Sequence, residues 1–193
     1  YDLGEMYNDG KDVPKNAAKA MEWYQKAAAQ GHARAQNDLG WMYADGEGVP
    51  KDAAKAVEWY QKAAAQGHAL AQANLGLMYG IGDGVPKDAV KAVEWYQKAA
   101  AQGHAGAQIN LGYAYRVGNG VSKNLVLAYA WSNLAAAQGI DAARNNRDTY
   151  ESQLTPAQRA EGQRLASNWK KGNTLASSDT VAGSTSPDGK PSK

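Results

Sequence analysis

The sequence predicts an all-α solenoid built from helix-turn-helix repeats and closed by a C-terminal helical cap. The first observation is a stretch that returns at a fixed step of 36 residues: residues 50–69 and 86–105 share PKDAAKAVEWYQKAAAQGHA, with Val90 in place of Ala54 as the one change. The second observation is that each copy carries two amphipathic helical patterns. A step of this size is typical of stacked helical repeats, in which neighbouring units cover one another's apolar faces.

Composition and charge limit the classes of function. The 193 residues are 44% hydrophobic and carry a formal net charge of only +2, with Lys and Arg spread along the chain. This balance gives no reason to expect a nucleic-acid partner. Cysteine is absent, which excludes disulfides, thiolate nucleophiles and cysteine metal sites. The sequence has no apolar run of about 20 residues that could span a membrane.

The second helix of the repeat is expected to begin after Val-Pro-Lys at 49–51, because proline prevents continuation from the previous helix, and an Asn or Asp can cap its first turn. These candidate caps recur at the repeat step: Asn16, Asp52, Asp88 and Asn124. At 100° per residue the alanines, Val57 and Tyr60 share one face, while Lys55, Glu58 and Lys62 lie opposite. A glycine then ends each helix, followed by a very short turn that makes the two helices antiparallel neighbours.

The first helix of each repeat is predicted over about 33–44, with Gly46 ending it. Gly40 lies inside this helix, where glycine costs about 1 kcal/mol relative to alanine. We expect that this cost is offset by the close approach of a neighbouring helix onto a surface without a side chain.

The pattern resembles the Sel-one-like repeat family, a relative of the tetratricopeptide repeat. The resemblance rests on Leu-Gly-Trp-Met-Tyr at 39–43, Asp-Gly-Glu-Gly-Val at 45–49, Trp-Tyr at 59–60, Lys-Ala-Ala at 62–64 and Gly67. It recurs in register over residues 1–140, as about four repeats of which the first is truncated. The resemblance implies a right-handed superhelix and a protein-interaction role without catalysis.

The two ends of the array differ. Because residues 1–7 match 37–43, the chain opens in the middle of a helix, and we expect further sequence upstream. Residues 141–172 are predicted to form a cap of two helices, about 141–153 and 156–171, the second opening with Thr155 and Gln158 in a capping box. Consistent with a cap, the outer stripe of the fourth repeat turns apolar at Leu127, Ala130 and Leu134. Residues 173–193 are predicted to be a disordered tail.

Two recurring motifs, the histidines and the Gly-x-Gly loops, could suggest a metal or phosphate site, but we expect both to have structural roles. His32, His68 and His104 recur at the repeat step, but equivalent helices lie on the order of 10 Å apart, too far to share one metal ion. We expect each histidine to serve the turn before a first helix. The Gly-x-Gly loops follow helices rather than strands, so they lack the context of a phosphate loop. No cofactor and no metal is expected.

Comparing the repeats with one another gives the strongest functional signal. Six positions of the first helix vary between copies, including Asn37/Ala73/Ile109 and Ala44/Gly80/Arg116, and all fall within an arc of about 120°. Apolar and aromatic residues are frequent there, which is typical of interface anchors rather than of solvent positions. The predicted partner-binding residues are Arg34, Asp38, Trp41, Asn74, Leu77, Ile81, Asn110, Tyr113 and Arg116.

The sequence therefore predicts a non-catalytic scaffold that binds a peptide or protein segment in the concave groove lined by the first helices. The alternative is a hydrolase acting on a cell-envelope substrate through groove carboxylates such as Asp38 or Asp45. A periplasmic or secreted location is favoured slightly over a cytoplasmic one.

Overall fold

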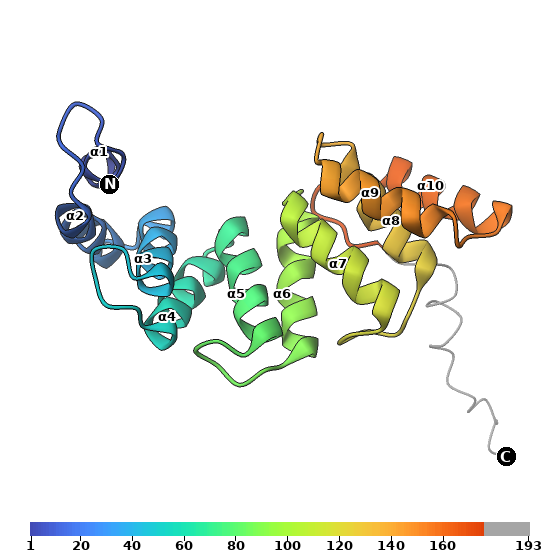
Figure 1. The fold of residues 1–193 in the computed structure, drawn as a ribbon, viewed down its shortest axis with the longest axis horizontal. Helices are drawn as coiled ribbons and strands as arrows, with labels where there is room; N and C mark the ends of the chain where they lie inside the picture. Colours follow the sequence, from blue (N-terminus) through green and yellow to red (C-terminus); the bar gives the residue numbers. More distant parts are fainter. Residues whose placement is uncertain (176–193) are drawn as a thin grey trace, which may run out of the picture.

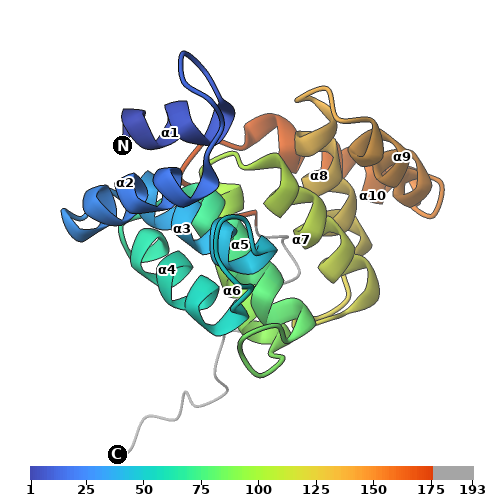
Figure 2. The same cartoon turned by 60° about the vertical axis from the view of Figure 1, so that its left-hand side comes forward.

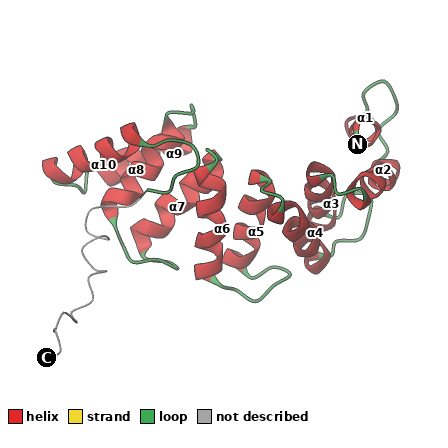
Figure 3. Cartoon of the chain, turned by 180° about the vertical axis from the view of Figure 1, so that it is seen from behind, coloured by secondary structure: helices red, strands yellow, loops and turns green. Residues whose placement is uncertain are grey.

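The computed structural model describes residues 1–175, and within that range the chain folds into ten α-helices and no strands (Figures 1 and 3). The helices are Asp2–Asp9 (α1), Ala17–Ala29 (α2), Ala33–Asp45 (α3), Ala53–Ala65 (α4), Ala69–Ile81 (α5), Ala89–Ala101 (α6), Ala105–Val117 (α7), Leu125–Ala136 (α8), Asp141–Glu151 (α9) and Pro156–Asn168 (α10). The predicted all-α class is confirmed.

The helices form antiparallel pairs that stack into a curved row. The first helices of the repeats (α1, α3, α5 and α7) each pack on the second helix of the same repeat (α2, α4, α6 and α8). Each second helix also packs on the first helix of the following repeat, so every pair touches its neighbours in the chain. Viewed from a second direction, the row curls, with α1–α2 and α8–α10 at its two ends (Figure 2). This arrangement is a solenoid.

Local signals set where the helices begin and end. The side chains of Asn16, Asp52, Asp88 and Asn124 each accept a hydrogen bond of 3.0 Å from the backbone N–H three residues later, as predicted. At the end of α3, Gly46 adopts a left-handed φ of 82° and its N–H donates to the Met42 carbonyl. Helix α3 runs one residue beyond its expected end, to Asp45.

The glycines inside the first helices allow close packing, and a tyrosine ring approaches Gly40 and Gly76, whereas the Ser132 hydroxyl approaches Gly112. A Cβ added at Gly40 would lie 2.6 Å from Cδ1 of Tyr60, and one added at Gly76 would lie 2.7 Å from Cδ1 of Tyr96. Both tyrosines are buried in the second helix of the same repeat. The predicted close approach is confirmed, and atoms of an aromatic ring rather than helix backbone make the nearest contact.

Buried glutamines connect successive repeats. Gln72 on α5 donates from Nε2 to the Ala64 carbonyl at the end of α4 (3.2 Å), and its Oε1 accepts from Gln102 Nε2 after α6 (2.8 Å). The same two bonds occur one repeat earlier through Gln36 and one repeat later through Gln108. We call this set the glutamine relay. It adds a hydrogen bond to helix-end carbonyls that also accept from the backbone, as the Ala64 carbonyl does from the N–H of Gly67 at 3.0 Å.

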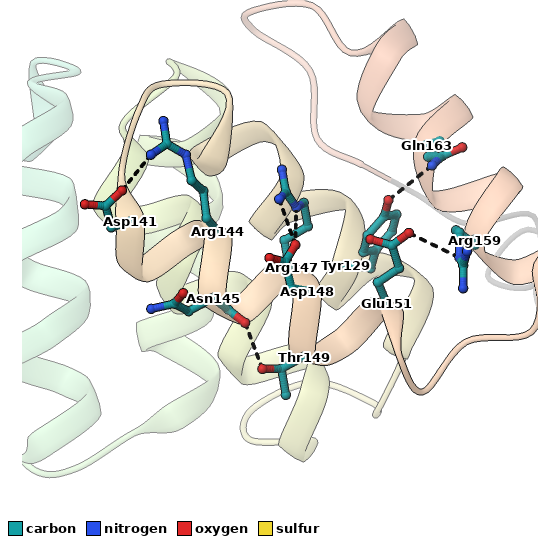
Figure 4. A network of polar contacts seen from close by, with 10 residues as sticks. All are labelled: Tyr129, Asp141, Arg144, Asn145, Arg147, Asp148, Thr149, Glu151, Arg159 and Gln163. Carbon is teal, nitrogen blue, oxygen red and sulfur yellow. Dashed lines mark hydrogen bonds and ion pairs between the residues drawn. The ribbon is translucent and has the colours of Figure 1, made fainter.

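Two further helices, α9 and α10, follow the fourth repeat and pack on α8. Leu127 and Ala130 of α8 are buried beneath α10, where Leu165 belongs to the same apolar cluster. Two polar contacts tie α10 to its neighbours: Gln163 donates to the Tyr129 hydroxyl of α8 at 3.4 Å, and Arg159 pairs with Glu151 of α9 at 3.3 Å (Figure 4). The capping box of α10 forms as expected.

Both cap helices are shorter than predicted. Helix α10 ends at Asn168 instead of about 171, because Trp169 turns to an extended conformation and donates from its indole Nε1 to the Asn173 carbonyl (2.8 Å). The chain then returns to α6, where the N–H of Gly172 donates to the Ala101 carbonyl, and Leu175 is buried. Beyond Leu175, the tail predicted to be disordered lies outside the described residues.

Candidate functional site

Exposed apolar side chains gather at the variable positions of the first helices. In residues 1–175, seven large hydrophobic side chains are exposed, and six of them lie at variable positions of α3, α5 and α7. These six are Trp41, Leu70, Leu77, Ile81, Tyr113 and Val117. With the polar residues Arg34, Asp38, Asn74, Asn110 and Arg116, we call this set the variable strip. Single exposed apolar side chains are ordinary, but their concentration at one set of positions is typical of an interaction surface.

The strip contains anchors suited to contact with another molecule. Trp41 and Tyr113 occupy equivalent positions on α3 and α7, and their side chains are 42% and 52% exposed. Leu77 lies at the same position on α5 between them. Ile81, one turn later on α5, is 59% exposed. Large aromatic and aliphatic groups at such sites contribute disproportionately to protein interfaces.

One variable position belongs to the packing between helices. Asn37 is 3% exposed and Ala73 is also buried, while Ile109 packs beside a buried alanine cluster of α8 and α9. The expectation that all six variable positions escape the stacking constraint is therefore wrong at this one. The Asn37 amide contacts the neighbouring first helix, since its Oδ1 accepts from Asn74 Nδ2 at 3.3 Å.

Asp38, a candidate carboxylate of the hydrolase alternative, is held by structural partners. It accepts hydrogen bonds from the Tyr1 hydroxyl (3.0 Å) and from Asn37 Nδ2 (3.2 Å). Burial raises the pKa of the Asp38 carboxyl, and these two hydrogen bonds oppose the shift. Asp45 is exposed at the end of the same helix. Two helical turns separate the two aspartates, about 10 Å along the axis.

The recurring histidines serve the turns, as predicted. Nδ1 of His32, His68 and His104 accepts from the N–H three residues later at 3.2, 3.3 and 3.2 Å, so each ring caps a first helix. Burial lowers the pKa of His68 and His104. Within residues 1–175, no cluster of three or more His, Asp or Glu side chains is placed to hold a metal ion.

The Gly-x-Gly loops also have a packing explanation. Gly82 and Gly84 both have positive φ, 81° and 72°. A Cβ on Gly84 would collide with the Ala53 carbonyl at the start of α4, so the loop after α5 lies directly against the preceding repeat. Only glycine combines this conformation with this approach. None of the helices described is long and apolar enough to cross a membrane.

Antiparallel helix pairs in register, with a cap at one end, define this chain as a helical-repeat solenoid. It belongs to the Sel1 repeat family, whose model matches residues 1–32, 33–68, 69–104 and 105–140. Proteins of this family are generally non-enzymatic scaffolds for protein–protein interaction. A search among curated proteins gave no match.

Solved structures of relatives share the fold. A protective antigen of uropathogenic Escherichia coli with an SLR fold is 39% identical, with a TM-score of 0.78 over 87% of this chain and 36% of that one. A Sel1 repeat protein from Oxalobacter formigenes is 40% identical, with a TM-score of 0.68 over 73% and 58%. Cysteine rich protein B of Helicobacter pylori is 26% identical, with a TM-score of 0.55 over 68% and 94%. The chain thus spans between about a third and three fifths of the first two relatives.

Sequence reasoning missed Ala114, which lines a pocket between α5, α6 and α7 together with Gly80, one of the variable positions. The preceding repeats have Met78 and Ala44 at these two positions. A comparison of side-chain size between repeats could have drawn attention to Ala114. Leu70, also at a variable position, was not among the predicted partner-binding residues and is exposed on the first turn of α5.

Proposed function

We propose that the protein is a non-catalytic scaffold that holds a peptide or protein segment along the variable strip. The observation that carries this proposal is the location of the exposed apolar side chains: six of the seven in residues 1–175 lie on one set of positions in α3, α5 and α7. Neutral variation at solvent positions would more often give Lys, Glu or Gln.

The spacing of the strip favours an extended segment as the ligand. The anchors lie on three successive first helices, and a second helix packs on both members of each pair. They can therefore contact side chains several residues apart in a partner. Asn74 and Asn110 lie between the apolar groups at equivalent positions and are half-buried. Their amides can donate to and accept from the backbone of a bound segment.

No observation favours the hydrolase alternative over the scaffold. Catalysis by a carboxyl pair needs two groups facing one substrate, whereas Asp38 is bonded to Tyr1 and Asn37. Turnover of a cell-wall polymer by the purified protein, abolished by Asp38→Asn, would refute the non-catalytic assignment.

The test compares two faces of the array. Trp41→Ala and Tyr113→Ala remove exposed anchors, and each should weaken partner binding by about 2 kcal/mol or more. Lys55→Ala and Lys62→Ala are matched controls on the opposite face of α4, where both side chains are exposed. Lys55 pairs with Asp52, and exposed ion pairs contribute little, about 0–1 kcal/mol.

Partners captured from the native host by the wild-type protein should be lost with the two aromatic variants and kept with the two lysine variants. Melting curves should be nearly unchanged for all four proteins, because none of these side chains lies in the core. Partners lost with the lysine variants and kept with the aromatic variants would place the binding site on the opposite face.

A further inference from the structure

A pocket opens within the variable strip, between α5, α6 and α7. Its volume is about 170 Å³. Leu77, Ile81 and Tyr113 line it beside the buried Val93 and Tyr96. The wall is therefore largely apolar, and Asn110 supplies an amide at its edge.

Two small residues make room for this pocket. Gly80 and Ala114 stand where the preceding repeat has Ala44 and Met78. A Cβ added at Gly80 would meet Ala92 and Tyr96 only at ordinary contact distances of 3.7 Å, so the space beside Gly80 can accept an atom. The pocket therefore depends on the residue types at these two positions.

The volume suits one apolar side chain. An apolar cavity of about 150 Å³ holds a molecule of benzene, and a side chain the size of leucine is comparable. Pockets for whole small-molecule ligands are larger, from about 300 Å³. The dimensions therefore favour a side chain that projects from a bound segment.

A positive charge lies beside the pocket. The Arg116 guanidinium is 5.8 Å from the ring centre of Tyr113, which lines the pocket, and 5.7 Å from that of Tyr150 on α9. None of the ion pairs within residues 1–175 involves Arg116; its guanidinium hydrogen-bonds the Tyr150 hydroxyl, and its buried Nε has no hydrogen-bond partner there. A half-buried cation without a carboxylate is complementary to an acidic group on a ligand.

We infer that the segment bound by the strip places one aliphatic side chain in this pocket and a nearby carboxylate against Arg116. This inference rests on the proposed function and deepens it, because it names the chemistry of the partner: a peptide segment with an acidic residue close to a leucine, isoleucine or valine. The strip supplies the general anchoring, and the pocket with Arg116 supplies the selectivity.

The test uses the full chain and a displayed library of random twelve-residue peptides. Peptides enriched on the wild-type protein should share an aliphatic residue with Asp or Glu within a few positions. One such peptide is then synthesised with Leu→Ala and with Glu→Gln, and Kd is measured by fluorescence anisotropy. Each change should weaken binding about tenfold or more, the scale expected for a group lost from a fitted pocket.

Variants of the protein test which residues produce the preference for Leu over Ala and the preference for Glu over Gln. Gly80→Ala with Ala114→Met rebuilds the pocket to match the preceding repeat and should abolish the preference for Leu over Ala. Gly80→Ala alone should reduce it, which keeps the test informative if the double variant melts early. Arg116→Gln should abolish the preference for Glu over Gln, and Arg116→Lys should retain it. Trp41→Ala should weaken all peptides equally.

The outcomes separate this inference from the proposed function. Enriched peptides that need Trp41 but share no aliphatic and acidic pair would overturn the inference and leave the scaffold intact. If the variant Gly80→Ala, Ala114→Met still preferred the Leu peptide over the Ala peptide, the inference would also be overturned and the scaffold left intact. Enriched peptides matching this chain's own sequence, with self-association in sedimentation, would make a second copy the occupant and also overturn the inference. Peptide binding that is unchanged in both Trp41→Ala and Tyr113→Ala would overturn the proposed function itself.

Discussion

Gly76 and Gly80 lie four residues apart on α5 and meet different surroundings. Gly76 faces the buried ring of Tyr96, while Gly80 borders the open pocket. The same substitution should therefore have opposite effects at the two positions, which makes them a matched pair for testing how closely α5 and α6 pack.

Gly76→Ala should destabilise the protein by about 1–3 kcal/mol, because its Cβ would lie 2.7 Å from the Tyr96 ring and force a shift in a packed core. Gly80→Ala should instead stabilise it by up to about 1 kcal/mol, since alanine favours the helix and finds room. Urea unfolding of both variants measures the two effects. Equal stability of the two proteins would contradict the tight contact at Gly76.

The buried histidine caps predict a pH dependence. Burial lowers the pKa of His68 and His104 in the folded chain, so the unfolded chain takes up protons first as the pH falls through about 6.5. Protonation would also turn Nδ1 from an acceptor into a donor and break the cap. The melting temperature should therefore fall between pH 7.5 and pH 5.5.

The double variant His68→Asn, His104→Asn is the control for this effect, because asparagine caps a helix without titrating. The melting temperature of this variant should fall much less between pH 7.5 and pH 5.5 than that of the wild-type protein. The pKa of Asp38 is raised, so Asp38 adds its own pH dependence to the melting temperature. This contribution is the same in both proteins and cancels in the comparison. An identical decline in both would show that the histidines are not responsible.

At the scale of helices, the glutamine relay joins the end of one repeat to the next. Gln72 makes two hydrogen bonds, one to the Ala64 carbonyl and one from Gln102, and its side chain is buried. Neither contact lies within a single helix. The relay therefore stabilises the stacking of repeats rather than the helices themselves.

Gln72→Met should cost about 1–3 kcal/mol, because it removes two hydrogen bonds and leaves the Gln102 amide without its partner, although the Ala64 carbonyl keeps the N–H of Gly67. Gln61→Met on the exposed face of α4 is the control and should change stability by less than about 0.5 kcal/mol. Chemical denaturation followed by circular dichroism compares them. A negligible effect of Gln72→Met would mean that the relay contributes nothing to stacking.

At the scale of the whole molecule, the cap protects the last repeat. Leu127, Ala130 and Trp131 of α8 are almost fully buried, and α10 packs over this helix. A solenoid exposes an apolar face at any end that is not covered. Removing α10 should therefore expose an apolar surface of α8 that promotes self-association.

A chain shortened to end at Ser152 retains α9 but lacks α10 and the return segment to α6. We expect it to self-associate and to melt at a lower temperature than the 193-residue chain, as measured by sedimentation velocity and circular dichroism. A monodisperse shortened protein with the melting temperature of the 193-residue chain would show that α10 is not needed as a cap.

The sequence by itself determined the repeat, its helix pairs and their ends. Asp52, Gly46 and the Thr155 capping box act within one or two turns, so their signals can be interpreted without knowing what packs on them. The exposed strip was predictable for a related reason. Positions on the stacking face stay nearly the same in every repeat, so most of the positions that vary lie away from that face.

Only the tertiary structure decided which contacts cross between repeats. It showed that Asn37 is buried, that Gln72 connects α4 to the end of α6, and that Gly80 and Ala114 border one pocket with Arg116 beside it. Gln72 and Gln102 are 30 positions apart, and Gly80 and Ala114 lie in different repeats. They depend on the angle and distance at which helix pairs stack, and side-chain packing across the whole interface sets both.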